Sequence, residues 1–248
     1  MPRVLRCGIV VLATMVLFAT APAGTGMAAT TPGVAVAGVT PSRGDVVGVG
    51  MPVTVRFTAP VINRAAAERS IHVESPGSLK GQFRWLNDNV VQWVPVGLLP
   101  AHSHIEVSAY GFSTEFETGA SVVGVASISQ HTFTVSIDEQ VARVMPASLG
   151  KPKYPTPVGS FTALEKQRTV TFDSRTIGIP LNSPDGYVIK GEYAVRVNWG
   201  GVYVHSAPWS VGSQGKANVS HGCINLSPDN AAWYFDNVNI GDPIVVNG

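Results

Sequence analysis

The sequence predicts a mainly all-β protein, and three observations support this prediction. Hydrophobic residues make up 45% of the 248 residues, whereas charged residues make up only 13%. The chain contains 26 glycines and 18 prolines, which favour many short strands and turns over long helices. Apolar and polar residues alternate in many short stretches, as half-buried strands require. A chain of this length can form one large domain or two smaller ones, so the number of domains has to be judged from the order of the predicted elements.

The first 29 residues are predicted to be a signal peptide that is removed. Arg3 and Arg6 precede the apolar run 8–19, which is too short for a comfortable membrane span. Small residues between Ala23 and Thr30 offer cleavage sites, and an uncleaved membrane anchor is the alternative. We therefore expect an exported protein in the periplasm or cell wall, near the outer face of the cytoplasmic membrane.

Residues 30–38 are predicted to be a linker, and residues 39–120 an immunoglobulin-like sandwich. The linker is small and uncharged. Beyond it, turn residues separate alternating stretches at the spacing that is typical of such sandwiches. The expected strands contain residues 53–57, 71–73, 83–85, 90–94 and 105–109. Residues 64–69 interrupt the alternation, and we expect them to form a single helical turn.

A second set of strands is predicted in residues 121–248, and it begins with a β-hairpin. Residues 127–135 alternate, a turn is expected at Asp138-Glu139, and the chain returns through residues 141–145. Residues 172–191 are rich in turn residues. Because long loops inside compact domains are usually functional, we expect this segment to act as a lid.

The end of the chain is predicted to contain paired strands, one short helix and a last strand. Residues 193–199 and 201–204 alternate and lead directly into His205. The helix is expected to start at Ser227-Pro228-Asp229, because Ser caps a helix well, Pro suits its first position and Asp suits its positive end. The last strand is expected at residues 243–246.

The charge of the chain argues against nucleic acid as a partner. The formal net charge is +1, and no run rich in Lys or Arg follows the signal segment. His72, His102 and His104 lack the spacing to Cys or carboxylate residues that a metal site needs. We therefore predict no metal and no cofactor.

Cys223 is the single cysteine that remains once Cys7 is lost with the signal peptide. A lone thiol in an exported protein needs an explanation. It lies in Ser220-His221-Gly222-Cys223-Ile224-Asn225, and His205 ends a predicted strand upstream. A neighbouring histidine can activate a thiol as a nucleophile. If residues 221–223 are extended, His221 and Cys223 point to one face.

Four interpretations of this cluster remain open on the residues alone. Cys223 could be a buried structural cysteine, which is the most common state of an isolated thiol. A zinc site would need carboxylates that the local sequence does not supply. A redox thiol would need a second cysteine with which to cycle. Acyl transfer by a Cys–His nucleophile requires only the residues that are present.

The motif resembles the signature of the L,D-transpeptidases with the YkuD catalytic domain. That signature consists of a His, a spacer, and then Ser/Thr-His-Gly-Cys-apolar-Asn. In this chain His205 and residues 220–225 match every position of the signature, and the spacer between them has 14 residues. Pro155 to Phe161 is similar to a second element of the same domain. His205-Ser206-Ala207-Pro208-Trp209 and the order of the modules resemble the mycobacterial two-domain type, with an immunoglobulin-like N-terminal module.

This resemblance implies a fold and an activity. Residues 121–248 would form a YkuD-type β-sandwich or barrel with one short helix. Enzymes of this family take a peptidoglycan tetrapeptide stem, release its D-Ala and pass the meso-diaminopimelate acyl group to the amine of another stem. The product is a 3→3 cross-link, and the partners are therefore donor and acceptor stem peptides. Carbapenems would acylate the cysteine.

The resemblance also implies a role for each site residue. Cys223 would be the nucleophile, His205 the base and later the acid, and Ser206 the residue whose backbone carbonyl orients His205. Backbone N–H groups near Gly222 and Cys223 would receive the oxyanion. The residues expected to bind substrate or shape the site are Tyr187, Trp209, Ser220, His221, Gly222 and Asn225.

Two alternatives to the transpeptidase remain. Water could resolve the acyl-enzyme instead of an amine, which would make the protein an L,D-carboxypeptidase with the same nucleophile. The chain could also be a non-catalytic wall-binding protein, although intact His205 and Cys223 argue against it.

Overall fold

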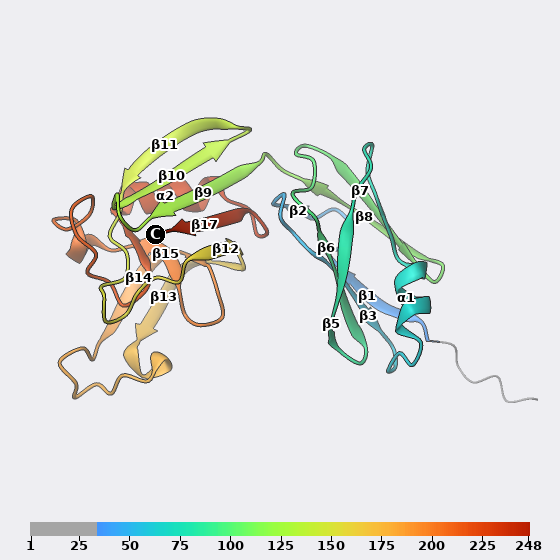
Figure 1. Ribbon diagram of the computed structural model, residues 1–248, viewed down its shortest axis with the longest axis horizontal. Helices are drawn as coiled ribbons and strands as arrows, with labels where there is room; N and C mark the ends of the chain where they lie inside the picture. The colour runs from blue at the N-terminus through green and yellow to red at the C-terminus, as the bar shows by residue number, and fades with distance from the viewer. Residues whose placement is uncertain (1–33) are drawn as a thin grey trace, which may run out of the picture. The chain divides into compact units, whose positions relative to one another are not determined.

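The computed structural model describes residues 34–248, and Figure 1 shows its ribbon. The predicted signal peptide and residues 30–33 of the predicted linker lie outside the described residues. The described part consists mostly of strands with two α-helices and two short 3-10 helices, which confirms the mainly all-β prediction. None of the helices in residues 34–248 is long and apolar enough to cross a membrane.

The first eight strands form two four-stranded sheets, with orders β1-β3-β6-β5 and β2-β8-β7-β4. Alternating side chains from both sheets, among them Val53, Phe57, Ile105 and Phe116, are buried in one hydrophobic core. The elements are β1 (Val36–Thr40), β2 (Val46–Val47), β3 (Val53–Phe57), α1 (Arg64–Ser70), β4 (His72–Glu74), β5 (Gly81–Asn87), β6 (Val90–Pro95), β7 (His104–Ala109) and β8 (Phe112–Thr118).

Two predictions for this part need correction. The first strand begins at Val36, inside the predicted linker, because the small residues of this stretch pair with β3. Strand β8 was not expected as a separate strand, although it pairs with β7 along its whole length. The predicted helical turn is confirmed as α1, where the Asn63 side chain accepts a hydrogen bond from the Ala66 N–H.

The remaining strands form a five-stranded sheet, β11-β10-β9-β17-β12, and a four-stranded sheet, β13-β14-β15-β16 (Figure 1). One hydrophobic core, with Phe133, Leu149, Val204 and Tyr234 in it, is shared by both sheets and α2. The elements are β9 (Val122–Ser127), β10 (Thr132–Ile137), β11 (Gln140–Pro146), β12 (Gly159–Thr162), β13 (Glu165–Asp173), η1 (Ser174–Ile177), β14 (Val188–Arg196), β15 (Tyr203–Ser206), η2 (Pro208–Ser210), β16 (Ile224–Leu226), α2 (Pro228–Asn237) and β17 (Pro243–Asn247).

The prediction of one strand over residues 127–135 is wrong. Strand β9 ends at Ser127 and β10 begins at Thr132, and the two pair as an antiparallel hairpin. Between them His131 adopts a φ of +55°, which a continuous strand does not permit. The helix prediction is confirmed, since the Ser227 side chain caps α2 by accepting a hydrogen bond from the Asn230 N–H.

Candidate functional site

The candidate site is a cavity of about 680 Å³ beside the sheet β13-β14-β15-β16. Its walls come from β13, β14, β15, η2 and the segment before β16. Ser206 and Gly222 are not among the described residues that line the cavity. The structure brings the other predicted site residues to the lining, namely Tyr187, His205, Trp209, Ser220, His221, Cys223 and Asn225.

Parallel pairing of β15 and β16 brings the histidine and the cysteine to one wall of the cavity. His205 lies opposite Asn225 in the register, and Cys223 directly precedes β16. The His205 side chain is buried and Cys223 is half-buried. The Trp209 ring follows on η2, with its centroid 6.0 Å from that of His205.

The Cys223 thiol is neutral at rest. Burial raises its pKa to about 11, and a hydrogen bond from the Tyr203 backbone opposes this shift only in part. The sulfur lies 3.7 Å from the carbonyl oxygen of Gly201, to which the thiol donates. The fold therefore holds a protonated thiol, not a preformed thiolate.

His205 is neutral at rest as well. Burial lowers its pKa to about 4, although the Ser206 carbonyl and Asn225 act in the opposite direction. His205 Nδ1 lies 2.7 Å from the Ser206 backbone oxygen, and since a carbonyl only accepts, Nδ1 carries the proton. The other ring nitrogen is then the basic one, and the ring packs 4.5 Å from that of Phe172.

The expectation that His221 and Cys223 share one strand face is wrong. Gly222 has a φ of +114°, which breaks the extended conformation at this point. The His221 ring instead lies between the rings of Tyr154 and Tyr187, at centroid distances of 4.8 and 5.0 Å. Burial and then the charge of Lys151 lower the pKa of His221.

Ser220 and Gly222 fix the turn that carries the thiol. The Ser220 hydroxyl donates to the Cys223 carbonyl at 2.7 Å and accepts from the Gly222 N–H at 3.1 Å. Thr156 Oγ1 donates to the Gly222 carbonyl at 2.9 Å. The Gly222 N–H is therefore already engaged, which leaves it unsuited to the oxyanion role that was expected near it.

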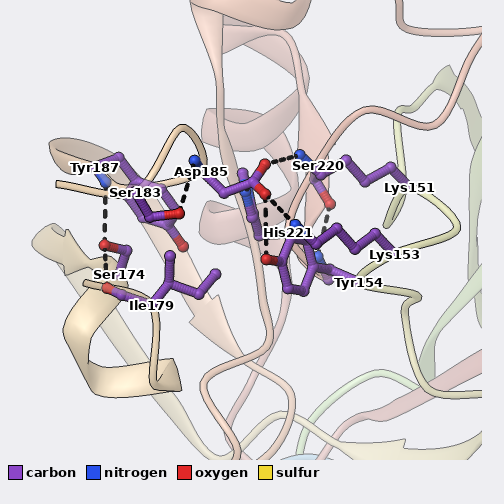
Figure 2. A network of polar contacts seen from close by, with 11 residues as sticks. Lys151, Lys153, Tyr154, Ser174, Ile179, Ser183, Asp185, Tyr187, Ser220 and His221 are labelled. Atoms are coloured by element: carbon purple, nitrogen blue, oxygen red, sulfur yellow. Dashed lines mark hydrogen bonds and ion pairs between the residues drawn. The ribbon is translucent and has the colours of Figure 1, made fainter. Parts of the chain in front are cut away.

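Sequence reasoning missed a carboxylate that ties the predicted lid to the loop before β12 (Figure 2). Asp185 lies 2.6 Å from the ammonium groups of both Lys151 and Lys153, and the Tyr154 hydroxyl donates to it at 3.3 Å. These cations hold the pKa of Asp185 well below its usual range. The partners are about thirty residues apart in the chain, so no local pattern reveals the contact.

Figure 2 also shows how the lid holds Tyr187. The Ser174 hydroxyl accepts from the Tyr187 N–H at 3.1 Å and donates to the Ile179 carbonyl at 2.9 Å, which closes the loop at its base. Burial, with smaller contributions from Cys223 and Asp173, raises the pKa of Tyr187 to about 12. Tyr187 is therefore a neutral hydroxyl donor at the cavity.

The site chemistry is that of a thiol and an imidazole. Within residues 34–248, no group of three or more His, Cys, Asp or Glu side chains is placed to hold a metal ion.

Comparisons with known proteins agree with this arrangement. The family model described as the L,D-transpeptidase catalytic domain, YkuD, matches residues 121–246, and a bacterial Ig domain model matches residues 22–112. The chain is 62% identical over 213 residues to L,D-transpeptidase 1 of Mycobacterium tuberculosis (strain ATCC 25618 / H37Rv), which covers 86% of this chain and 85% of that protein.

Two solved structures are also similar. A structure of the L,D-transpeptidase LdtMt1 in complex with imipenem has a TM-score of 0.81 at 62% identity and covers 87% of this chain and 100% of that chain. The structure of L,D-transpeptidase 3 from Mycobacterium tuberculosis in complex with a faropenem-derived adduct has a TM-score of 0.79 at 53% identity. It covers 86% of this chain and 98% of that chain. These matches confirm the resemblance that the cysteine motif indicated and the immunoglobulin-like fold of the first module.

Proposed function

The chain belongs to the L,D-transpeptidase family, and on this premise we propose that it forms 3→3 meso-diaminopimelate cross-links through an acyl-enzyme on Cys223. One observation carries the proposal: Cys223 and a His205 whose second ring nitrogen is basic line the same cavity. A neutral pair of this kind starts acyl transfer by moving one proton.

In the first half-reaction Cys223 attacks the carbonyl of the donor's diaminopimelate. The thiol proton passes to His205, whose imidazolium is stabilised because Nδ1–H already donates to the Ser206 carbonyl. The C–N bond to D-Ala then breaks, and the same proton leaves with the D-Ala amine. A thioester on Cys223 and a neutral His205 remain.

In the second half-reaction the side-chain amine of another stem attacks the thioester. His205 takes a proton from this amine as the new C–N bond forms, and it returns a proton to the sulfur as the C–S bond breaks. The thiol and the neutral imidazole are restored, so the reaction is a ping-pong exchange of one amide for another.

The negative charge that develops on the attacked carbonyl oxygen needs hydrogen-bond donors. Tyr187 is proposed as one of them, because it lines the cavity as a neutral hydroxyl. The backbone N–H of Cys223 is proposed as the other, since the Gly222 N–H is engaged by Ser220. Trp209 and Asn225 are proposed to line the peptide-binding surface.

Carbapenems are proposed as covalent inhibitors of Cys223. The similar proteins in complex with imipenem and with a faropenem-derived adduct support this proposal. The stem peptides as substrates, and a location outside the cytoplasmic membrane, follow from the same family relationship and are proposed with it.

The test is mass spectrometry of a disaccharide-tetrapeptide muropeptide after incubation with the protein, beside a Cys223→Ala control. We expect a dimer that is lighter by one D-Ala and is absent from the control, because only the thiol can hold the acyl group. Monomers shortened to tripeptide would identify a carboxypeptidase instead. Untouched substrate with folded protein would identify a wall-binding protein.

A further inference from the structure

Arg196 stands out because it is the one lysine or arginine among the described residues that line the cavity, where it forms an ion pair with Glu165. Among the described lining residues, the other charged side chain is Asp173, which is neutralised by its ion pair with Arg175. The Arg196 side chain is only 19% exposed, and it lies at the end of β14 next to the cavity. A guanidinium in such surroundings is weakly screened by solvent.

The guanidinium is held in one orientation by three contacts. Its Nε donates to Glu165 Oε2 at 2.7 Å, and its carbon lies 4.5 Å from the centre of the Tyr203 ring and 5.1 Å from that of Trp199. Within residues 34–248 no hydrogen-bond partner is found for the two terminal nitrogens. One edge of the planar group is therefore fixed, while the edge that matches a carboxylate is free.

Arg196 and Cys223 are related through the pairing of β14, β15 and β16. Arg196 pairs with Tyr203 in the register of β14 and β15, and Tyr203 is the residue whose backbone hydrogen bond reaches Cys223. The thiol itself donates to Gly201, on the turn that joins the same two strands. In the order of the strands, Tyr203 on β15 lies between Arg196 on β14 and Cys223, which directly precedes β16.

A second arginine, on the neighbouring strand, makes similar contacts away from the cavity and serves as a comparison. Arg168 on β13 also stacks on a tyrosine, Tyr193, at 3.7 Å and pairs with a glutamate, Glu192, at 3.4 Å. Its side chain is 55% exposed, and it does not line the cavity. The burial and position of Arg196, not its contacts alone, therefore distinguish it.

We propose that Arg196 is a substrate-binding residue that anchors the free carboxylate of the donor's terminal D-Ala, one residue beyond the bond that Cys223 attacks. The identity of this carboxylate rests on the proposed function. In this position Arg196 selects donors that end directly after the scissile bond, because a neutral or extended end would leave its two terminal nitrogens unpaired. Glu165 is a positioning residue that keeps the guanidinium in plane.

The first experiment needs no peptide substrate. Alkylation of Cys223 by iodoacetate and by iodoacetamide is followed by mass spectrometry of its peptide, for the unaltered protein, Arg196→Gln, Arg196→Lys and Arg168→Gln. A cation beside the sulfur favours the anionic reagent, so Arg196→Gln should lower the ratio of iodoacetate to iodoacetamide rates by about tenfold, the effect of one charge-assisted hydrogen bond. Arg168→Gln should leave the ratio unchanged.

The iodoacetamide rate reports whether the site is intact. A rise in that rate for Arg196→Gln would mean that the variant has opened the fold. Arg196→Lys would then decide whether the positive charge matters, because it keeps the charge and should keep much of the ratio of iodoacetate to iodoacetamide rates. An unchanged ratio in a folded Arg196→Gln, or the same loss in Arg168→Gln, would overturn the anchor.

The second experiment compares a tetrapeptide donor with its terminal carboxamide. The unaltered protein should prefer the carboxylate about tenfold or more in kcat/KM, mainly through KM, and Arg196→Gln should lose this preference. A lowered alkylation ratio without any turnover by the unaltered protein would keep the anchor and refute the proposed function. A lowered ratio with turnover but no preference would refute the assignment to D-Ala.

Discussion

At the scale of single residues, the resting site is a neutral thiol beside a neutral imidazole. Burial causes both states, because it raises the pKa of Cys223 to about 11 and lowers that of His205 to about 4. His205 is therefore proposed to act as a base during attack and not as the counter-ion of a stored thiolate.

Two histidines compete for this role, and substitution separates them. His205→Ala should reduce acylation of Cys223 by a carbapenem by a factor of about 10² to 10⁴, the usual contribution of a general base. His221→Ala should retain much of the rate, because its ring packs between Tyr154 and Tyr187. The acyl-enzyme is counted by intact-protein mass spectrometry over time.

The control for these variants is Cys223→Ala, which should gain no mass. A full rate in His205→Ala together with a lost rate in His221→Ala would transfer the base role to His221.

The motif predicted which residues gather at the site but not how they are arranged. The spacing from His205 to Cys223 was sufficient to place both at one cavity. The positive φ of Gly222 was not evident, because a glycine between two polar residues is compatible with both a strand and a turn. Arg196 was not identified, since its burial depends on Tyr203 and Trp199 packing against it.

At the scale of elements, the lid is the segment from η1 to the start of β14, which carries Tyr187. Its tip is tied to the loop before β12 by Asp185, whose side chain is only 17% exposed. Lys151 is the better-buried partner, with 29% of its side chain exposed, whereas Lys153 is 66% exposed. The pair with Lys151 should therefore contribute most of the restraint.

Asp185→Asn should loosen the lid without removing it. The substitution keeps the shape of the side chain but removes the charge that both lysines contact. We expect amide hydrogen exchange in residues 174–187 to become several-fold faster, because local opening no longer has to break these ion pairs. Exchange is measured by mass spectrometry of proteolytic peptides.

The matched control is Asp138→Asn. Asp138 also contacts a basic side chain, with His102 Nε2 2.9 Å from its carboxylate, and it accepts a hydrogen bond from the Ser121 N–H, but it lies in the turn after β10. Exchange in residues 174–187 should not change in this variant. Unaltered lid exchange in Asp185→Asn would show that the ion pairs do not hold the lid.

Alternation predicted most strands, and the failures have local physical causes. Strand β6 was expected from a pattern that lies within it, and helix α2 from its cap Ser227 and its first two residues. The break between β9 and β10 was missed because the prediction treated residues 127–135 as one alternating stretch, although the four consecutive polar residues 129–132 interrupt the alternation where the turn lies. The lid contacts were missed because they join segments far apart in the chain.

At the scale of the whole described chain, residues 48–50 run alongside residues 240–242. The N–H groups of Gly48 and Gly50 donate to the carbonyls of Ile240 and Gly241 at 2.8 and 2.9 Å. The Val49 N–H donates to the buried Asp242 carboxylate at 3.3 Å. The turn before β3 is thus bonded to the turn before β17.

Gly48→Ala should destabilise the protein through this contact. A Cβ at Gly48 would lie 2.1 Å from the backbone nitrogen of Asp242 and 2.5 Å from the Gly241 carbonyl carbon, and backbone atoms cannot move aside cheaply. We expect the free energy of unfolding to fall by about 1–3 kcal/mol, as in overpacked sites, with a lower Tm. Calorimetry of the full chain measures the shift.

The control is Gly77→Ala, because a Cβ at Gly77 would meet nothing within 4 Å. Its Tm should stay within error of the unaltered protein. If Gly48→Ala melted at that same temperature, the close approach of residues 48 and 242 would not exist in solution.

The place of β17 has a consequence for the order in which the protein is made. This strand follows every other strand along the chain, yet it lies inside its sheet, with β9 on one side and β12 on the other. Until residues 243–247 emerge, β9 has an unpaired edge, whereas strands β1 to β8 already have all their partners. Synthesis therefore delivers a first module that can fold early and a second one that must wait, with its apolar edge open to wrong pairing in the interval.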